Sequence, residues 1–306
     1  MALDRLEAMR AFCRIVETGG FGKAAESLGL ATTTVSGQVR ALETLLGIRL
    51  LHRSTRKVAP TPEGAAYYAR ARALIDEVDE LETSVSQSQR VVRGRVSIEM
   101  PTPVGLHLVI PALPDFTVKF PEIQLDVGCG ERVVDLVGEG IDCAIRGGTL
   151  ADLDLVSRSV GQMRFCVCAA PAYLAGAAPI DHPAGLARHR RLGFRFPGTG
   201  KQLVPTLTRR HESVSLDQAP CMYFDSGAAA AAAAVAGLGV AFLARAEAAQ
   251  HLRTGDLVEI LEDWRMASMP LSVVYPPTRR LSAKVRAFTD WVADLMASDP
   301  LWSQTG

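Results

Sequence analysis

The residues of this chain that could do covalent or metal chemistry are its six cysteines and six histidines. No two cysteines form a CxxC pair, and Cys166 and Cys168, two apart in a strand-like segment, would share one face of that strand. The histidines show neither ligand spacing nor the context of a catalytic triad. We therefore expect no metal, no cofactor and no enzymatic activity. The cysteines are Cys13, Cys129, Cys143, Cys166, Cys168 and Cys221.

The cellular compartment determines whether these cysteines form disulfides or stay free thiols. The first residues, MALDRLEAMRAFCRIVE, carry acids early, unlike a secretory signal, and no apolar run approaches the ~18 residues of a membrane helix. The expected location is the cytoplasm, with no membrane contact and with free, mostly buried thiols. A thiol redox switch stays open as an alternative function. It would need two cysteines that can meet, or one exposed thiol of low pKa.

The segment LGLATTTVSGQVRALE, residues 28–43, points to a different chemistry. Val35, Val39 and Leu42 keep helical spacing, but three threonines and Gly37 are poor helix formers. A helix that reads DNA is selected for the groups that it presents to base edges and phosphates, so poor formers are understandable there. A threonine methyl can meet a thymine methyl, and a glutamine can pair with adenine. The residues expected to contact DNA from this helix are Thr32, Thr33, Thr34, Ser36, Gln38 and Arg40.

The preceding residues fit a helix-turn-helix. One helix is expected to end near Gly19, and a second to start around Phe21. The motif needs a small residue where its helices cross, a glycine of positive φ in the turn and a buried aliphatic residue in the second helix. Ala25, Gly29 and Val35 supply these three residues in order.

A small β-wing is predicted next, in RLLHRSTRKVAPT, with Arg53, Arg56 and Lys57 at its tip. Beside a helix-turn-helix these cations favour phosphate or minor-groove contact, and a solvated charge cluster is the alternative. The chain has no net charge, but residues 1–62 hold nine Lys or Arg against five Asp or Glu. A basic module on a mildly acidic body fits DNA contact at one end only.

A linker helix is expected over residues 62–91. Its apolar residues form a narrow 4-3-4-3-4 seam flanked by acids, which suits pairing with another helix better than packing on its own domain. We expect this seam to form a homodimer that binds a palindromic operator in double-stranded DNA. The seam contains Ala71 and the dimerisation residues Tyr67, Leu74, Val78, Leu81 and Val85.

Residues 11–64 resemble the DNA-binding domain of the LysR-type transcriptional regulators. The resemblance implies a winged helix-turn-helix over 1–61, dimerisation through the linker helix, assembly to a homotetramer and contact with RNA polymerase. The chain departs from the family pattern at Gly20, Gly22, Ala31, Thr32, Gly37 and Pro60, which affects base preference more than fold. The residues that match the pattern are Phe21, Ala24, Ala25, Leu28, Val35, Ser36, Leu42, Glu43, Leu46, Gly47, Leu50, Arg53, Thr61 and Gly64.

Beyond residue 92 short apolar strands alternate with helical stretches, which predicts a doubly wound α/β fold. The helices are expected over 105–119, 131–139, 227–236 and 282–297. The alanine run 228–234 is interpreted as a helix packed closely on a sheet.

The stretches DLVGEGIDCAIRGG and VYPPTRRLSAKVRAFTDWV resemble the same family's effector-binding domain. The resemblance implies two α/β lobes like those of type 2 periplasmic binding proteins. Within 92–306, lobe I would comprise 92–163 and 267–306, and lobe II 164–266.

Ligands of such domains lie at the carboxyl ends of strands, near helix N-termini. We expect a small organic acid there, because a helix N-terminus at Thr102 and the guanidinium of Arg146 both favour an anion. The alternatives are that Thr102 caps a helix, that Cys129 fills a core, and that Arg146 bridges the lobes or pairs with a carboxylate. The expected effector-binding residues are Thr102, Pro103, Cys129, Arg146, Arg195, Phe196, Asp225 and Ser226.

Overall fold

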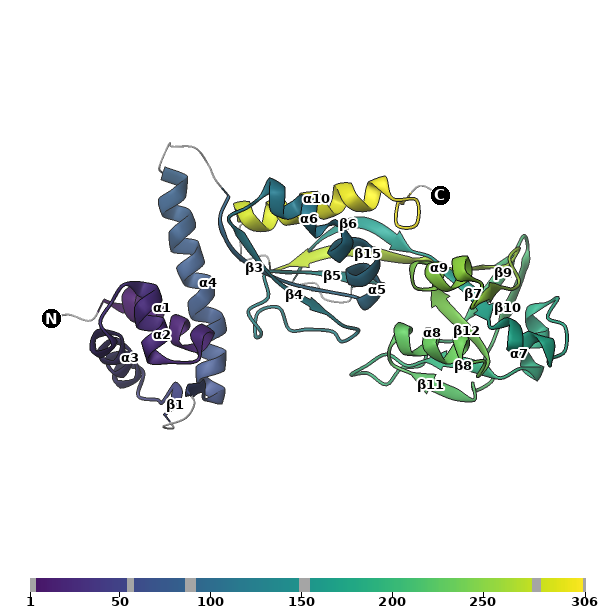
Figure 1. The fold of residues 1–306 in the computed structure, drawn as a ribbon, viewed down its shortest axis with the longest axis horizontal. Coiled ribbons are helices and arrows are strands. Elements are labelled where there is room, and N and C mark those ends of the chain that lie inside the picture. Colours follow the sequence, from purple (N-terminus) through teal and green to yellow (C-terminus); the bar gives the residue numbers. More distant parts are fainter. Residues whose placement is uncertain (1–3, 54–57, 86–91, 149–154, 277–281, 305–306) are drawn as a thin grey trace.

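The computed structural model describes residues 4–53, 58–85, 92–148, 155–276 and 282–304. Figure 1 shows three parts in a row: a small helical domain, a first α/β lobe and a second α/β lobe. The helix α4 (Pro62–Val85) stands between the helical domain and the first lobe. None of the described helices is both long and apolar enough to cross a membrane.

The helical domain is the predicted helix-turn-helix. Its helices are α1 (Arg5–Thr18), α2 (Phe21–Leu28) and α3 (Thr32–Leu46). Asp4 caps α1 by accepting hydrogen bonds from the Leu6 and Glu7 amides at 3.0 and 3.1 Å. Gly29 ends α2 with φ of 65°, the left-handed conformation expected in the turn. Ala25 and Val35 are buried between the helices, so the three residues take the positions that their spacing predicted.

The predicted wing is present as an antiparallel hairpin of β1 (Leu51–Arg53) and β2 (Val58–Pro60). The buried Glu43 of α3 fixes its start, since Glu43 Oε1 accepts hydrogen bonds from the Leu50 and Leu51 amides at 2.9 and 3.2 Å. Arg56 and Lys57 lie outside the described residues, as does the side chain of Arg53.

The helix α4 packs its first half on the helical domain. Tyr67 contacts Phe12 edge to face, with ring centroids 5.7 Å apart, and Ala71 and Ile75 are buried in the same core. Leu74 and Leu81 are 50% and 66% exposed, respectively, in the single chain. The structure thus divides the predicted seam between a part that faces its own domain and a part that faces outward.

The first lobe is built on a five-stranded sheet in the order β4-β3-β5-β15-β6. β3 runs parallel to β4 and β5, and β15 runs antiparallel to β5 and β6. The strand bounds are β3 Gly94–Met100, β4 Ile123–Cys129, β5 Cys143–Gly147, β6 Val156–Met163 and β15 Met269–Tyr275. β6 is an edge strand that the sequence analysis did not anticipate.

Helices cover one face of this sheet. A helical run consists of α5 (Thr102–Val104), a π-helical turn (Gly105–Val109) and α6 (Ile110–Lys119), and it packs against α10 (Ala283–Ser298). Phe116 of α6 lies 5.8 Å from Phe288 and 4.9 Å from Trp291 between ring centroids. These contacts join the first segment of the lobe to the returning C-terminal segment.

The helix expected over 131–139 is wrong, because this segment forms bends and turns. The Asp135 side chain accepts a hydrogen bond from the Gly138 amide at 2.9 Å, which closes a local turn instead of a helical one. Arg132 and Glu139 pair across the segment at 2.8 and 2.5 Å. Val134, Leu136 and Ile141 are buried in a core that includes Ala144 and Val274 of the sheet.

The second lobe has a five-stranded sheet in the order β11-β8-β12-β7-β13 and a three-stranded sheet, β10-β9-β14. The bounds in the larger sheet are β7 Phe165–Ala169, β8 Arg191–Phe194, β11 Met222–Phe224, β12 Val240–Ala244 and β13 Val258–Glu259. The smaller sheet contains β9 Thr206–Arg209, β10 Glu212–Ser215 and β14 Arg265–Met266. The remaining helices are α7 Pro171–Ala175, a 3₁₀ turn Pro183–Arg188, α8 Gly227–Val235 and α9 Arg245–Thr254.

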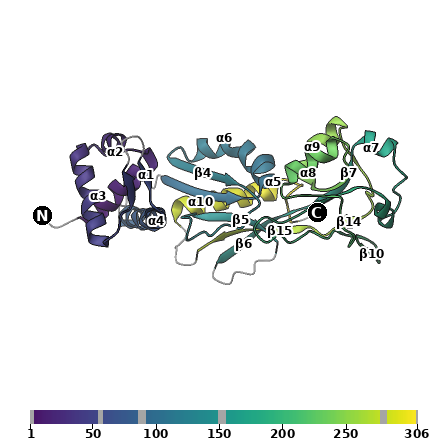
Figure 2. The same ribbon diagram turned by 90° about the horizontal axis from the view of Figure 1, so that it is seen from below.

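The alanine run forms α8, as predicted, and its packing explains the composition. Ala230, Ala231, Ala233 and Ala234 are buried against Cys166, Cys168, Leu192 and Leu243 of the sheet. Small side chains allow the helix axis to approach the strands closely. In Figure 2, as in Figure 1, α8 and α9 lie side by side near α5, where the two lobes meet.

Candidate functional site

The exposed face of α3 carries the polar residues that were expected to read DNA. Val35, Val39 and Leu42 are buried on the opposite face. Thr32, Thr33, Thr34 and Arg40 are exposed, and Ser36 and Gln38 are half-buried. The threonines lie in the first turn, where backbone amides and hydroxyls point outward and can meet phosphate or base edges.

A cavity lies between the two lobes and takes its lining from both. It has a volume of about 1130 Å³, counting its open mouth. The carboxyl ends of β3, β5 and β8 reach it, together with Gly227 and Ala230 of α8 and one side chain from α9. Much of its wall is apolar, formed by Met163, Phe165, Phe194, Phe196, Phe242 and Met269. A concave shape, apolar walls and a few polar groups are the features of a small-molecule site.

Arg146 of β5 is the predicted cation in this cavity. Its Nη2 donates to the Val134 carbonyl at 2.6 Å, which fixes the guanidinium against the turn segment. Its Nε is buried and has no hydrogen-bond partner among the described residues. A buried N–H without a partner is costly, so this donor is available to a ligand oxygen.

The helix terminus at Thr102 meets a carboxylate of the protein itself. The hydroxyl and backbone amide of Thr102 lie close enough to Glu131 to stabilise its charge, and they oppose the rise that burial causes in the pKa of Glu131. Glu131 lines the cavity, and its Oε1 is buried without a partner within the described part of the chain. Thr102 itself is not among the lining residues, but its neighbours Pro101 and Pro103 are, and the carboxylate that it stabilises belongs to Glu131.

Glu247 of α9 is a second carboxylate in the wall, and only 6% of it is exposed. Its Oε1 lies 4.0 Å from Nε2 of His107, on the helical run of the first lobe. Its Oε2 lies next to Gly227, at the N-terminus of α8, without a hydrogen-bond partner in the described residues. Burial, together with the charge of Glu131, raises the pKa of Glu247 to about 7.

The other expected effector-binding residues divide into two groups. Pro103 and Phe196 line the cavity. Arg195 stacks on the Tyr223 ring, 4.5 Å from its centroid, and Ser226 accepts from the Ala229 amide at 3.5 Å as the cap of α8. Asp225 is exposed beside this cap. Cys129, Arg195, Asp225 and Ser226 are not among the residues that line the cavity.

The cysteines are free thiols in the structure. Cys129 and Cys221 are exposed, and the other four are buried. Cys129 Sγ faces Gly105, where a Cβ would lie 2.3 Å from the sulfur, so the glycine allows the strand and the helical run to approach. Burial and the charge of Glu99 raise the pKa of Cys129, which reduces its thiolate fraction. No cluster of three or more His, Cys, Asp or Glu within the described ranges could hold a metal ion.

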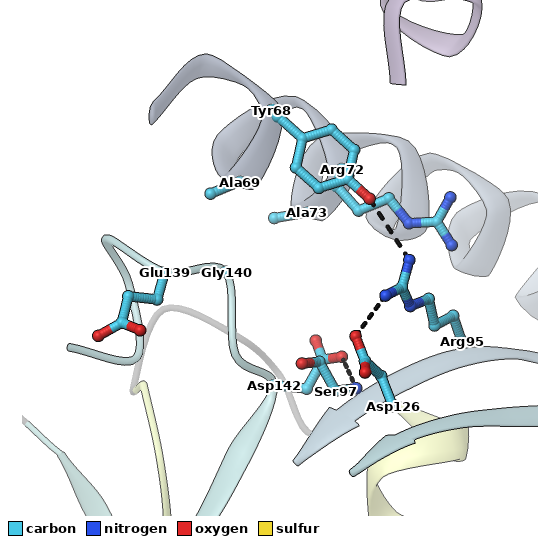
Figure 3. Close-up of a pocket in the computed structure, with 10 residues that line it drawn as sticks. All are labelled: Tyr68, Ala69, Arg72, Ala73, Arg95, Ser97, Asp126, Glu139, Gly140 and Asp142. Atoms are coloured by element: carbon cyan, nitrogen blue, oxygen red, sulfur yellow. Dashed lines mark hydrogen bonds and ion pairs between the residues drawn. The ribbon is translucent and has the colours of Figure 1, made fainter. Parts of the chain in front are cut away.

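A polar contact connects α4 with the first lobe, as Figure 3 shows. The Tyr68 hydroxyl donates to Glu17 Oε1 at 3.2 Å and accepts from Arg95 Nη1 at 3.4 Å. Arg95 also pairs with Asp126 of β4, and Arg72 pairs with Glu17 at 3.1 Å. Burial and the charge of Glu17 raise the pKa of Tyr68 to about 12, so its hydroxyl stays protonated.

Two carboxylates in the cavity wall were missed by the sequence analysis. Glu131 stands two residues after the end of β4, so the rule that ligands meet strand carboxyl ends could have included it. Glu247 stands three residues after the end of β12, in the first turn of α9, so the same rule could have included it.

A winged helix-turn-helix joined by a long helix to a two-lobed domain with an internal cavity defines a class of protein, the ligand-responsive transcriptional regulators. Comparison with known proteins gives the family. The family model described as bacterial regulatory helix-turn-helix protein, lysR family, matches residues 6–65, and the LysR substrate binding domain model matches residues 89–297. The chain belongs to the LysR family of transcriptional regulators.

Individual relatives agree with this assignment. An HTH-type transcriptional repressor of Pseudomonas aeruginosa is 34% identical over 298 residues, which cover 97% of this chain and 94% of the relative. The solved structure of CrgA, a LysR-type transcriptional regulator of Neisseria meningitidis, is 30% identical with a TM-score of 0.59 and covers 94% of this chain and 97% of that one. A full-length variant of OxyR from Pseudomonas aeruginosa shares the fold at 17% identity, with a TM-score of 0.67 and 98% of both chains covered. The relatives are named as regulators and not as enzymes, in agreement with the sequence analysis.

Proposed function

We propose that this regulator binds a palindromic operator as a homodimer and that an organic carboxylate in the cavity between its lobes controls its activity. The observation that carries the effector proposal is Arg146, whose buried Nε lacks a partner among the described residues beside a large cavity. A carboxylate would satisfy this donor and gain a charge-assisted hydrogen bond in a desolvated site.

The walls of the cavity restrict the rest of the effector. Phe165, Phe194 and Phe242 come from the larger sheet of the second lobe, and Phe196 lies two residues after the end of β8. Such side chains favour an apolar or aromatic body. The proposed effector is therefore a small carboxylate with an apolar portion.

A connection from the cavity to the DNA-binding domain is present in β3. Glu99, near the carboxyl end of this strand, lines the cavity, and Arg95, near its start, contacts Tyr68 of α4. A ligand that moves β3 would therefore also move α4, through the contact between Arg95 and Tyr68. Contact of the assembled regulator with RNA polymerase stays a prediction.

The proposed dimer uses the outward half of α4. Leu74 is half exposed in the single chain, whereas Tyr67 is already packed on Phe12. Leu74→Asp would place two carboxylates opposite each other across a two-fold axis, which costs several kcal/mol. We expect a smaller species in sedimentation and weak binding to a palindromic site. An unchanged mass would place the dimer contact elsewhere.

The effector proposal is tested by calorimetry of the full-length protein against organic carboxylates, amines and neutral sugars. We expect every binder to carry a carboxylate, and Arg146→Ala to weaken binding about 30-fold or more because a desolvated charge loses its partner. Arg188→Ala is the matched control, because Arg188 is exposed in the second lobe away from the cavity. Binding of sugars or simple amines alone, or equal binding of carboxylates by the Arg146 variant, would contradict the proposal.

The thiol redox switch remains the alternative function. Peroxide treatment followed by mass spectrometry and a DNA-binding assay separates it from ligand sensing. A mass shift that leaves the DNA response intact supports ligand sensing, whereas loss of the response together with oxidation of Cys129 or Cys221, the exposed thiols, supports the switch.

A further inference from the structure

We propose that the effector also carries a protonated amine, which is held between Glu131 and Glu247, so that the ligand is an amino-acid-like zwitterion with an apolar body. This inference rests on the proposed function, in which the carboxylate of the same ligand meets Arg146.

Each lobe contributes one of the two carboxylates. Glu131 follows β4 of the first lobe, and Glu247 belongs to α9 of the second. Both line the cavity, and each has a buried oxygen without a partner in the described chain, Oε1 of Glu131 and Oε2 of Glu247. Glu247 is more than nine-tenths buried, so its unpartnered oxygen cannot be satisfied by bulk water.

The surroundings hold these carboxylates in place without neutralising them. Glu131 lies beside the hydroxyl and amide of Thr102, which lower its pKa against the effect of burial, and Glu247 lies at the N-terminus of α8, next to Gly227. Burial still raises the pKa of both carboxylates, so the ionised form of each gains from a cation that binds beside it. His107 is 4.0 Å from Glu247, but burial and His251 lower its pKa, so it is mostly neutral near pH 7.

The balance of charge in the cavity also favours a cation beside the proposed carboxylate. Glu99, Glu131 and Glu247 line it, against Arg132 and Arg146. Arg132 is engaged by Glu139, with bonds of 2.8 and 2.5 Å. An anionic ligand alone would meet Arg146 and leave the buried oxygens of Glu131 and Glu247 unpaired, whereas an ammonium group has N–H donors for both.

The chemistry of the wall favours an organic cation over a metal ion. Mg²⁺ and Ca²⁺ require about six or more oxygen ligands, many of them water, in a polar shell. The wall next to Glu247 instead contains Phe242, Leu243 and Ala244 of β12. An ammonium group on an apolar body fits both the carboxylates and this wall.

An amine between these residues would join the lobes. Without a ligand, burial and, as a smaller cause, repulsion by the charge of Glu131 raise the pKa of Glu247, so its ionised form is unfavourable. A cation converts this repulsion into two attractions, one from each lobe. Closure of the lobes would therefore depend on the amine, and specificity for zwitterions over simple acids would follow.

The test uses matched triplets on the full-length protein: an amino acid, its deaminated acid and its decarboxylated amine. The triplet of phenylalanine, 3-phenylpropionate and 2-phenylethylamine suits the aromatic wall, and leucine and methionine supply two more. Calorimetry should show at least one amino acid bound about 30-fold or more tightly than its deaminated acid. Glu247→Gln and Glu131→Gln should reduce this preference to within about threefold. Glu262→Gln, an exposed acid of the second lobe outside the cavity, should preserve it.

The outcomes separate this inference from the proposed function. If acids bind as tightly as their amino acids and Arg146→Ala abolishes both, the amine contact is wrong and the carboxylate proposal stands. If Arg146→Ala leaves amino-acid binding intact while Glu247→Gln abolishes it, the carboxylate contact is wrong and the amine contact stands. Absence of binding by every amino acid overturns the inference. Binding of Mg²⁺ or Ca²⁺ alone that Glu247→Gln abolishes overturns it as well, in favour of a metal site.

Discussion

Two glutamates, one in the DNA-binding domain and one in the cavity wall, are buried to the same degree but differ in their hydrogen-bond partners. Glu43 and Glu247 are each 6% exposed. Glu43 accepts two backbone amides at the start of the wing. Glu247 has an oxygen that no described residue satisfies, and its pKa is raised to about 7. A partnered buried carboxylate is part of the fold, whereas an unpartnered one costs stability and is available to a ligand.

The largest effect on folding stability is expected when the partnered glutamate, Glu43, is replaced. Glu43→Ala removes both charge-assisted bonds and leaves the Leu50 and Leu51 amides buried without acceptors, which should lower the free energy of unfolding by about 3–5 kcal/mol. Chemical denaturation would measure the change. Glu43→Gln, which keeps an acceptor oxygen, should lose much less. Equal stability of wild type and Glu43→Ala would mean that solvent replaces the carboxylate.

A change in folding stability of the opposite sign is expected when the unpartnered glutamate, Glu247, is replaced. Because the folded state raises the pKa of Glu247 from 4.5 to about 7, folding favours its neutral form, and the stability of the wild type falls as pH rises from about 4.5 to 7. Glu247→Gln carries no such penalty. The variant should match the wild type near pH 4.5 and exceed it at pH 8 by up to about 3 kcal/mol. Thermal melts across this range test the difference, and a variant less stable than wild type at pH 8 would assign Glu247 a structural partner.

A similar contrast, between regions determined by residues close in sequence and regions determined by distant ones, explains which parts of the structure the sequence predicts. The helix-turn-helix is specified locally: Ala25, Gly29 and Val35 lie within eleven residues, and each meets a requirement of backbone or packing. The alanine helix is likewise encoded by its own composition and its Ser226 cap. Local patterns of this kind can be interpreted without tertiary contacts.

The cavity depends on contacts between distant segments. Arg146 could be selected from its place at a strand end, but nothing in its own segment shows that Val134 occupies one of its nitrogens. Thr102 was expected to face an anion, and the anion that it meets is Glu131. Glu247 reaches the cavity only because α9 packs beside the first lobe. The incorrect helix over 131–139 has a similar origin, since its apolar residues face a sheet from turns that Asp135 closes.

A smaller and position-specific effect is expected on the exposed face of α3. Thr33→Ala removes a hydroxyl and a methyl from a residue that contributes nothing to the buried core. Stability should stay within about 0.5 kcal/mol, and discrimination at one base pair should fall by about 1–3 kcal/mol. Binding to a set of single-base operator variants would show the change. A uniform loss over all operators would assign Thr33 to the DNA backbone instead.

The smallest and least selective effect is expected at Arg40, the exposed cation of the same helix. Exposed cations that neutralise phosphates release counterions, so Arg40→Ala should weaken all operator sequences alike by about 1 kcal/mol and reduce the slope of log affinity against log salt by about one. Titrations at several salt concentrations measure both quantities, and Thr33→Ala, which removes no charge, is the matched control for the slope. A change in base preference with an unchanged slope would show that Arg40 reads a base edge. Because the side chain is exposed, the melting temperature should stay the same, in contrast to the large shifts of opposite sign expected at the two buried glutamates.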